Sequence, residues 1–387
     1  MAASLTVHGH FYQPPRENPW TGTIDPQKSA APFHDWNERV HAEAYRPNAF
    51  AKISIGDAEV EVNNFERMSF DVGPTLLHWM ETADPETYRR IIDADHESLE
   101  RLGHGNAIAQ AYHHTILPLS PLREVRTQVR WGLADFRHRF GHDAEGMWLP
   151  ETATNDDVLD VLIEEGVAFT ILAPWQGRAW RDLDGGHWVD VGRVPIETRL
   201  PHLYRHRDGS GRTIVLFFYD ADIARRIAFE QAAGSAEALI SLFADRAIDG
   251  GLVHAATDGE TYGHHHRFGE LGLAYSLFVE AERHGMEPTN YGAFLDGYQV
   301  TREASLVDGA GSSWSCAHGV GRWATDCGCS TGGSEGWNQK WREPLRAALD
   351  LVKRSADETF DRLGWELFDD PWAARDAYVD VVIGKTD

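Results

Sequence analysis

The chain has 387 residues, 42% of them hydrophobic, which is enough for a sizeable core in one large domain or two ordinary ones. Its formal net charge of -24 argues against a nucleic-acid partner, because neutralising phosphates requires a basic surface. It contains no apolar run of the roughly 18 residues that a membrane span needs, so we expect no membrane span.

The excess of acidic residues is accompanied by scarce lysine. A folded, acidic, lysine-poor protein is typical of a salt-rich cytosol, where ions screen the self-repulsion of the charges. The alternative is an acidic protein that is merely soluble. The sequence starts without the charged and apolar regions of a signal peptide, so we expect a cytoplasmic location. Lysine occurs only at positions 28, 52, 340, 353 and 385.

In chain order, short apolar runs alternate with amphipathic stretches, a pattern that predicts βαβ units and a parallel sheet in an α/β fold. Short, mostly apolar strands in this number fit a closed or nearly closed barrel better than a sandwich. The expected strands are 4–10, 66–71, 106–112, 145–149, 167–172, 213–218 and 251–256. The expected helices between them are 86–102, 122–140, 154–165, 235–246 and 268–284.

Two long stretches, 11–65 and 173–212, have little or no clear periodicity, and we interpret both as excursions over the active face of the barrel. Residues 309–336 are rich in Gly, Ser and Cys, and 338–363 predict one long helix. We therefore expect a barrel domain over residues 1–308. A small module, made of the Cys/Gly-rich segment and C-terminal helices, would follow over 309–387.

Two carboxylates stand where an apolar, strand-like run stops and polar residues begin: Glu151, after Gly146–Pro150, and Asp258. In a parallel barrel, that end of a strand carries the chemistry. Two such acids on different strands, near tryptophans and histidines, are typical of a glycosidase. The alternative for either acid is a helix cap or a surface position. Asp220, after strand 213–218, is a third strand-end acid. It is either a residue of the site or a structural residue.

Histidine is abundant, with 20 residues, and pairs of histidines end two expected strands. Imidazoles at strand ends can hydrogen-bond sugar hydroxyls, bind metal or move protons. Of these pairs, we expect His10 and His114 to contact a sugar. The alternative for both is a structural histidine whose hydrogen bonds are satisfied within the protein.

The chain also has 14 tryptophans, whose indole rings can stack on the apolar faces of sugars. Core packing accounts for most of them. Trp175, Trp314 and Trp323 lie in polar, loop-like contexts and are the candidates for contact with a substrate.

Three cysteines and a histidine cluster within 14 residues: Cys316, His318, Cys327 and Cys329. A Cys₃His set is one way of holding a structural zinc ion. However, Cys-x-His followed by Cys-x-Cys is not a common zinc-finger spacing. Unligated thiols, or one disulfide with a free cysteine, are the alternatives.

Four motifs, in this order and at these strand ends, resemble those of glycoside hydrolase family 57, the retaining α-amylase-like enzymes on a distorted (β/α)7 barrel. The resemblance implies that Glu151 is the nucleophile and Asp258 the acid/base. Within the same motifs we expect Trp148, Glu260 and His264 to contact the substrate. The motifs are His8–Pro14, Tyr112–Leu119, Trp148–Glu151 and Asp258–His264.

The extent of the resemblance is roughly residues 4–300, together with the helical part after 337. The starting sequence His-Gly-His-Phe-Tyr-Gln-Pro-Pro and the cysteine segment look like those of one subgroup of the family.

We therefore expect a retaining enzyme that acts on α-linked glucans through a glycosyl-enzyme, by hydrolysis or by transfer to another sugar. Its partner would be an oligo- or polysaccharide, and the chemistry needs no cofactor. One alternative is a metal-dependent polysaccharide deacetylase on a related barrel, in which Asp258, His264 and His10 gather the metal. Another is a glucan-binding protein without catalysis. The sequence does not specify linkage, chain length or oligomeric state.

Overall fold

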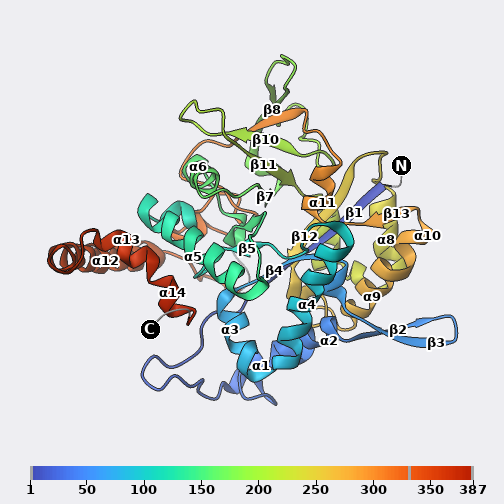
Figure 1. Ribbon diagram of the computed structural model, residues 1–387, viewed down its shortest axis with the longest axis horizontal. Coiled ribbons are helices and arrows are strands. Elements are labelled where there is room, and N and C mark those ends of the chain that lie inside the picture. Colours follow the sequence, from blue (N-terminus) through green and yellow to red (C-terminus); the bar gives the residue numbers. More distant parts are fainter. Residues whose placement is uncertain (1–2, 330–332, 385–387) are drawn as a thin grey trace.

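Seven parallel strands form a barrel at the centre of the molecule, with helices around it (Figure 1). The computed structural model describes residues 3–329 and 333–384. Parallel ladders and bridges join the strands in the order β12-β1-β4-β5-β6-β7-β11. The expected strands are confirmed as β1 (Ala3–Phe11), β4 (Ser69–Val72), β5 (Ala109–Gln110), β6 (Met147–Trp148), β7 (Phe169–Leu172), β11 (Thr213–Phe218) and β12 (Leu252–Asp258).

The barrel stays open on one side. Within residues 3–329 and 333–384, no ladder joins β11 to β12. A hydrogen bond from the backbone nitrogen of Asp220, just after β11, to the carbonyl oxygen of His254 in β12 spans the gap (2.9 Å). The fold is therefore the distorted (β/α)7 barrel that we expected, followed by a helical segment.

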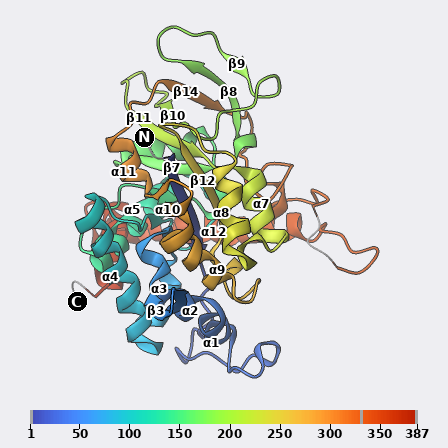
Figure 2. The same ribbon diagram turned by 90° about the vertical axis from the view of Figure 1, so that its right-hand side faces the viewer.

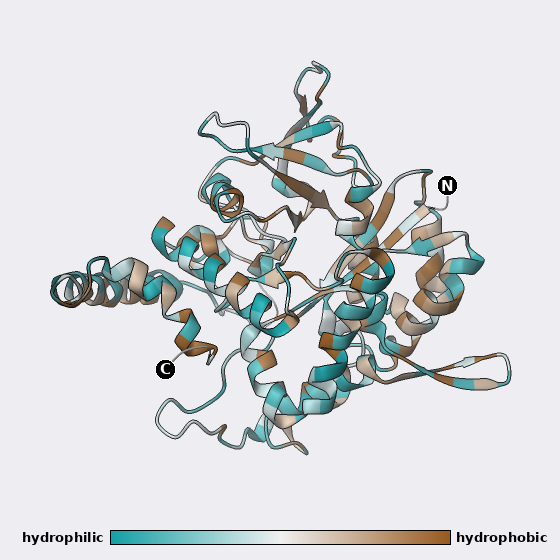
Figure 3. Ribbon diagram, in the orientation of Figure 1, coloured by the Kyte–Doolittle hydropathy of each residue, from teal (hydrophilic) through white to brown (hydrophobic). Residues whose placement is uncertain are grey.

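The barrel strands are covered on both faces, which explains why they occur in the sequence as nearly unbroken apolar runs. All four residues of β7 are buried, as are the last three of β11. The hydropathy colouring shows these central strands mainly in brown, while teal residues gather on the outer helices (Figure 3). Polar side chains enter at the carboxyl ends of the strands, where Glu151 and Asp220 follow β6 and β11 and Asp258 ends β12.

Local capping signals set the limits of the surrounding helices. Asp84 accepts hydrogen bonds from the first turn of α4 and Asn155 from that of α6, while Gly103 and Gly141 end α4 and α5 in the left-handed conformation. Figure 2 shows α7, α8 and α9 along the flank beside β12. The helices that surround the barrel are α3 (Pro74–Ala83), α4 (Pro85–Leu102), α5 (Leu122–Phe140), α6 (Asp156–Glu164), α7 (Ala221–Phe229), α8 (Ala236–Ala244), α9 (Gly269–Tyr275), α10 (Ala281–Arg283) and α11 (Tyr291–Asp296).

The segment 173–212 contains strands that the sequence did not predict. Together with β7, β11 and β14, a further strand that lies outside this segment and was not predicted, they form a six-stranded sheet in the order β7-β11-β10-β14-β8-β9. We missed them because they are partly exposed and carry charged residues, so they lack a continuous apolar run. The added strands are β8 (Gly177–Asp182), β9 (Val189–Asp190), β10 (His202–Arg205) and β14 (Arg302–Leu306).

The segment 11–65 also has more regular structure than its periodicity predicted. The hairpin of β2 and β3 projects from the body of the molecule (Figure 1). The elements of this segment include α1 (Trp36–Val40), α2 (Arg46–Ala49), β2 (Ala51–Ile55) and β3 (Ala58–Val62). Outside this segment, the short strand β13 (Met286–Pro288) pairs in parallel with the start of β1.

The long helix expected over 338–363 is present as α12 (Arg342–Leu367), followed by α13 (Pro371–Ala377) and α14 (Val379–Val382). Charged groups attach this segment to α5. Glu124 Oε1 accepts hydrogen bonds from Lys353 Nζ (3.1 Å) and from Arg375 Nη1 (3.0 Å). No helix within the described residues is both long and apolar enough to cross a membrane.

The boundary that we expected between residues 308 and 309 stays a prediction. The segment after it returns to the barrel, because Ser312 and Thr154 form a two-way backbone bridge (3.0 and 2.9 Å). The predicted domain ranges also include residues 1–2, 330–332 and 385–387, which lie outside the described residues.

A glycine sets the distance between α5 and the barrel. A Cβ atom on Gly132 would lie 2.0 Å from the backbone oxygen of Gln110 in β5. We expect Gly132→Ala to lower the free energy of unfolding by about 2–3 kcal/mol, because helix or strand must shift. Chemical denaturation measures this. Gly234→Ala, where a Cβ meets nothing within 4 Å, is the matched control; equal stability of the two variants would contradict the prediction.

Candidate active site

Glu151 lies on a strained backbone turn at the carboxyl end of β6. Glu151 and Thr152 have φ values of 60° and 48°, in the left-handed region that non-glycine residues rarely adopt. Among the described residues, five non-glycine residues have a positive φ. Besides Glu151 and Thr152 they include His114, which also follows a barrel strand. Strain of this kind concentrates at functional sites and persists only where the surroundings hold it.

The buried side chain of Gln176 holds this turn. Its amide nitrogen donates to the carbonyl oxygen of Thr152 (2.8 Å) and to Ser312 Oγ (3.1 Å). Its amide oxygen accepts from Thr152 Oγ1 (2.9 Å) and from the backbone nitrogen of Ala173 (2.8 Å). One side chain therefore connects the turn after β6, the end of β7 and the loop that contains Ser312.

The carboxylate of Glu151 receives two donors from that same loop. Trp314 Nε1 donates to Glu151 Oε2 at 2.9 Å, and Ser315 Oγ donates to the same oxygen at 2.5 Å. The backbone nitrogen of Trp314 also donates to the carbonyl oxygen of Glu151 (3.0 Å). Two donors on one carboxylate oxygen fix the orientation of the side chain.

Asp258 stands across the barrel mouth from Glu151. In the strand order, β1, β4 and β5 separate β12 from β6 on one side, and β7 and β11 on the other. Asp258 is open to the pocket but closely surrounded by protein atoms. This desolvation raises the pKa of its carboxyl, the charges of Glu151 and Asp71 raise it further, and His10 opposes them.

Ionisable side chains form a row across the ends of three neighbouring strands, with Asp258 on β12, His10 on β1 and Asp71 on β4. The strand register aligns His10 with Asp258 on one side and with Asp71 on the other. His10 Nδ1 lies 2.8 Å from Asp71 Oδ2, and its Nε2 lies 3.0 Å from His114 Nε2. The buried ring of Trp148 stacks on the ring of His10, with ring centroids 5.1 Å apart.

The proton distribution in this row follows from its charges. Burial lowers the pKa of His10, but the charges of Asp71, Asp258 and Glu260 outweigh it and raise that pKa to about 9. Burial and the neighbouring His10 lower the pKa of His114 to about 3. At neutral pH, His10 is therefore a cation that donates to Asp71 and to the neutral His114.

Glu260 is a third acid close to this row, and it is buried. Tyr45 Oη donates to its Oε1 (2.5 Å), and so does the backbone nitrogen of Tyr12 (3.2 Å). Burial, reinforced by the charge of Asp258, raises the pKa of Glu260 to about 7. The charge of Glu260 in turn helps to raise the pKa of His10.

Glu151 and Asp258 line one pocket of 780 Å³. Aromatic side chains form much of its wall: Trp175, which is 47% exposed, Phe229, which is 81% exposed, and the nearly buried Tyr219. Trp175 also donates its Nε1–H to the carbonyl oxygen of Ser313 (3.0 Å). The complete lining is Glu151, Trp175, Tyr219, Ala221, Asp222, Ala224, Arg225, Ala228, Phe229, Ala256, Thr257, Asp258, Trp314, Ser315 and Arg322.

Several residues expected to contact a substrate lie outside this lining. Trp148 is fully buried, under His8, His10 and Trp314. Asp220 caps α7 and pairs with Arg246 at 2.6 Å. As substrate contacts, these residues stay predictions.

His264 and Trp323 line other pockets of the protein. His264 pairs with Glu43 and lines a separate pocket with Arg39 and Arg267. Trp323 lies in another one, beside Trp341. Their substrate contacts likewise stay predictions.

The sequence reasoning missed several residues of the site. Asp71 is one, because it lies inside β4 and only the register sets it against His10. Tyr219 and Ser315 are others, and Gln176 is a fourth. The apolar run that ends in Tyr219 and the polar segment around Ser315 were visible, but their meeting at one pocket was not.

Two groups of potential metal ligands occur in the described part of the chain. One is Cys316, His318, Cys327 and Cys329; the other is His34, Asp35 and Glu38. Neither contains the set of Asp258, His264 and His10 that a deacetylase-like metal centre would require.

The cationic His10 makes stability depend on pH. Its pKa of about 9 lies above its ordinary value of 6.5, so its stabilising contribution is fully present below pH 6.5 and is lost as the pH rises through 9. We expect the stability difference between the wild type and His10→Gln to shrink over this range, as measured by chemical denaturation at several pH values. The exposed His187 supplies the control, His187→Gln. A difference that does not change from pH 6 to about 10 would contradict this protonation state.

Comparison with known proteins relates this geometry to a family. A family model described as "Glycosyl hydrolase family 57" matches residues 12–302, and one described as "Domain of unknown function (DUF3536)" matches residues 337–387. A 4-alpha-glucanotransferase of Thermococcus litoralis is 26% identical over 226 residues, which are 58% of this chain and 30% of that protein. An alpha-amylase of Pyrococcus horikoshii is 23% identical over 226 residues, with 58% and 31% covered. The chain thus spans about a third of the length of these relatives.

Solved structures show the same fold at low sequence identity. An exo-type maltose-forming amylase from Pyrococcus sp. ST04 superposes with a TM-score of 0.63 at 16% identity, covering 95% of this chain and 64% of that one. A branching enzyme from Pyrococcus horikoshii gives 0.56 at 17% identity, with 83% and 74% covered. Because the first family match runs from the end of β1 to the start of β14 and contains both strand-end carboxylates, this chain belongs to glycosyl hydrolase family 57.

Proposed function

We propose that this protein cleaves α-linked glucans with retention of configuration, with Glu151 as nucleophile and Asp258 as acid/base. The observation that supports this most directly is the shared pocket. It presents one carboxylate held by two donors and, across the barrel mouth, one carboxyl with a raised pKa. A retaining glycosidase needs two carboxyl groups with different roles in one site, a nucleophile that is ionised and an acid that holds a proton.

In the first step, Glu151 attacks the anomeric carbon while Asp258 donates its proton to the leaving oxygen. The glycosidic bond breaks and a covalent glycosyl-enzyme forms. In the second step, Asp258 takes a proton from water or from a sugar hydroxyl, whose oxygen attacks the anomeric carbon and releases Glu151. Water gives hydrolysis and a sugar gives transfer. The two carboxylates carry out both steps without a cofactor.

The residues around the pair have supporting roles in this proposal. His10, cationic through Asp71, stabilises the negative charge that Asp258 acquires when it gives up its proton. The buried Trp148 stacks on His10 and supports its ring. The exposed faces of Trp175 and Phe229 offer apolar surfaces on which sugar rings can stack.

The α-glucan substrate comes from the family relatives and not from this geometry alone. One is named as a 4-alpha-glucanotransferase and another as an alpha-amylase, so the relatives include both transfer and hydrolysis. Incubation with maltoheptaose, followed by mass spectrometry of the products, separates the two activities. Shorter oligomers alone mean hydrolysis, whereas shorter and longer ones together mean transfer.

We expect Glu151→Gln and Asp258→Asn each to lower kcat at least about 1,000-fold while the circular dichroism spectrum stays unchanged. The exposed Glu282, changed to Gln, is the matched control and should retain full activity. Near-normal turnover in either site variant would refute the assignment.

An activated aryl α-glucoside distinguishes the two roles. Its leaving group needs no acid, so Asp258→Asn should accumulate the glycosyl-enzyme, and peptide mapping should find the sugar on Glu151. Unchanged glucan binding by a Glu151→Gln protein, with no turnover by the wild type on any α-glycoside, would instead indicate a non-catalytic glucan-binding protein.

We also propose that the protein works in a salt-rich cytoplasm, since its net charge of -24 creates self-repulsion that salt screens. Circular dichroism should show loss of structure when salt falls from molar concentration to about 0.1 M, where screening reaches only about 10 Å. NaCl and KCl at equal ionic strength should act alike if screening is the cause. An unchanged spectrum at low salt would refute the proposal.

A further inference from the structure

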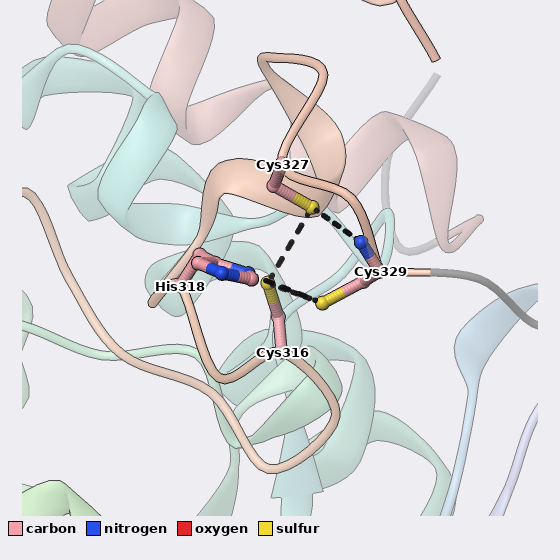
Figure 4. A group of neighbouring side chains, drawn as sticks. All are labelled: Cys316, His318, Cys327 and Cys329. Carbon is pink, nitrogen blue, oxygen red and sulfur yellow. Dashed lines mark hydrogen bonds between the residues drawn. The ribbon is translucent and has the colours of Figure 1, made fainter. Parts of the chain in front are cut away.

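Four side chains of the segment after β14 converge on one point (Figure 4). Cys316 Sγ lies 3.9 Å from Cys327 Sγ and 3.6 Å from Cys329 Sγ. His318 Nδ1 lies 3.4 Å from Cys329 Sγ. One ligand atom from each of the four lies within 4.8 Å of all the others.

These separations match the edges of a tetrahedron around a zinc ion. With Zn–S bonds of about 2.3 Å and a Zn–N bond of about 2.0 Å, tetrahedral geometry sets the sulfurs about 3.8 Å apart and the nitrogen about 3.5 Å from each sulfur. All three cysteines are free thiols, so no disulfide competes for this arrangement. Three thiol sulfurs and one imidazole form a complete ligand set for a closed structural site.

The backbone is shaped for this convergence. Gly328, between Cys327 and Cys329, has a φ of 81°, and Gly319, after His318, has a φ of 73°. A Cβ atom on Gly319 would lie 2.3 Å from the backbone oxygen of Gly311, so the loop packs too closely there for a side chain. Glycines in the left-handed conformation therefore stand directly beside three of the four ligands.

We propose that Cys316, His318, Cys327 and Cys329 bind one zinc ion. The three thiols lose their protons on binding and His318 coordinates as the neutral imidazole, so binding releases protons to solvent. The ion would join the two ends of the intervening loop, residues 317–326.

The site stands directly beside the pocket wall. Cys316 follows Trp314 and Ser315, both of which donate to Glu151, and Arg322, between the ligand pairs, lines the same pocket. The ion would fix this wall in position. Metal binding itself is independent of the proposed catalytic function, whereas any effect of the metal on turnover rests on that function.

Metal analysis of the purified full chain tests the site. We expect about one zinc per chain by inductively coupled plasma mass spectrometry, since the four ligands complete one tetrahedral site. Cys316→Ser and Cys329→Ser should lose most of it. The second group of potential ligands supplies the control, because His34→Ala should keep its zinc. A wild type that binds no zinc, even when refolded with it, would overturn the proposal, as would equal zinc contents in all variants.

A second measurement uses only the wild type, in case a cysteine variant fails to fold. Stepwise addition of an organomercurial should release zinc to a chromogenic chelator in proportion to the thiols that react. Cobalt in place of zinc should give the visible bands of a tetrahedral thiolate site. Three thiols that react at once without metal release, or a disulfide found by mass spectrometry in the protein as purified, would overturn the proposal.

Discussion

The left-handed turn at Glu151 and Thr152 is the constraint on which the rest of the site depends. Two adjacent non-glycine residues in this conformation cost roughly 1–3 kcal/mol each, so the turn exists only because its neighbours hold it. Gln176 holds it from the end of β7, and Trp314 and Ser315 hold the carboxylate itself. The direction of the Glu151 side chain is thus set by parts of the chain that follow it by 25 to 164 residues. For this reason the segment after β14 belongs to the site as much as the barrel does.

A second constraint is the register between neighbouring strands. Parallel pairing aligns Asp258, His10 and Asp71, so two carboxyl groups flank one imidazole at the same level of the barrel. The buried Asp71 makes His10 a cation, and this cation then moderates the raised pKa of Asp258. On the other side of the mouth, Glu151 forms no ion pair within residues 3–329 and 333–384, and the neutral groups of Trp314 and Ser315 hold it instead. Two carboxyl groups in one pocket therefore meet different environments, which is the requirement for one to attack and the other to transfer a proton.

The segment after β14 connects these features to the proposed zinc site. It supplies both donors to Glu151, closes one side of the pocket through Trp314 and Arg322, and continues into the cysteine cluster. Because Cys316 follows Ser315 directly, an ion bound there would limit the motion of the hydroxyl that donates to Glu151. The family model for the barrel ends at residue 302, so this wall lies outside the part of the chain that the model describes.

The sequence by itself determined the strand positions and the two principal acids. Barrel strands are buried on both faces, so each was a short apolar run, and Glu151 and Asp258 stood where such runs ended. The partly exposed strands β8 and β10 had no such run and could not be found. Only the tertiary structure decided which polar groups meet: Asp71 reaches His10 through strand register, Gln176 and Trp314 reach the turn at Glu151 from distant segments, and His264 is held by Glu43 away from the pocket. These are long-range contacts set by packing, and the sequence around one residue does not indicate which distant residue it contacts. The cysteine spacing left three interpretations open for the same reason, since only the folded loop brings four ligand atoms to the edges of one tetrahedron.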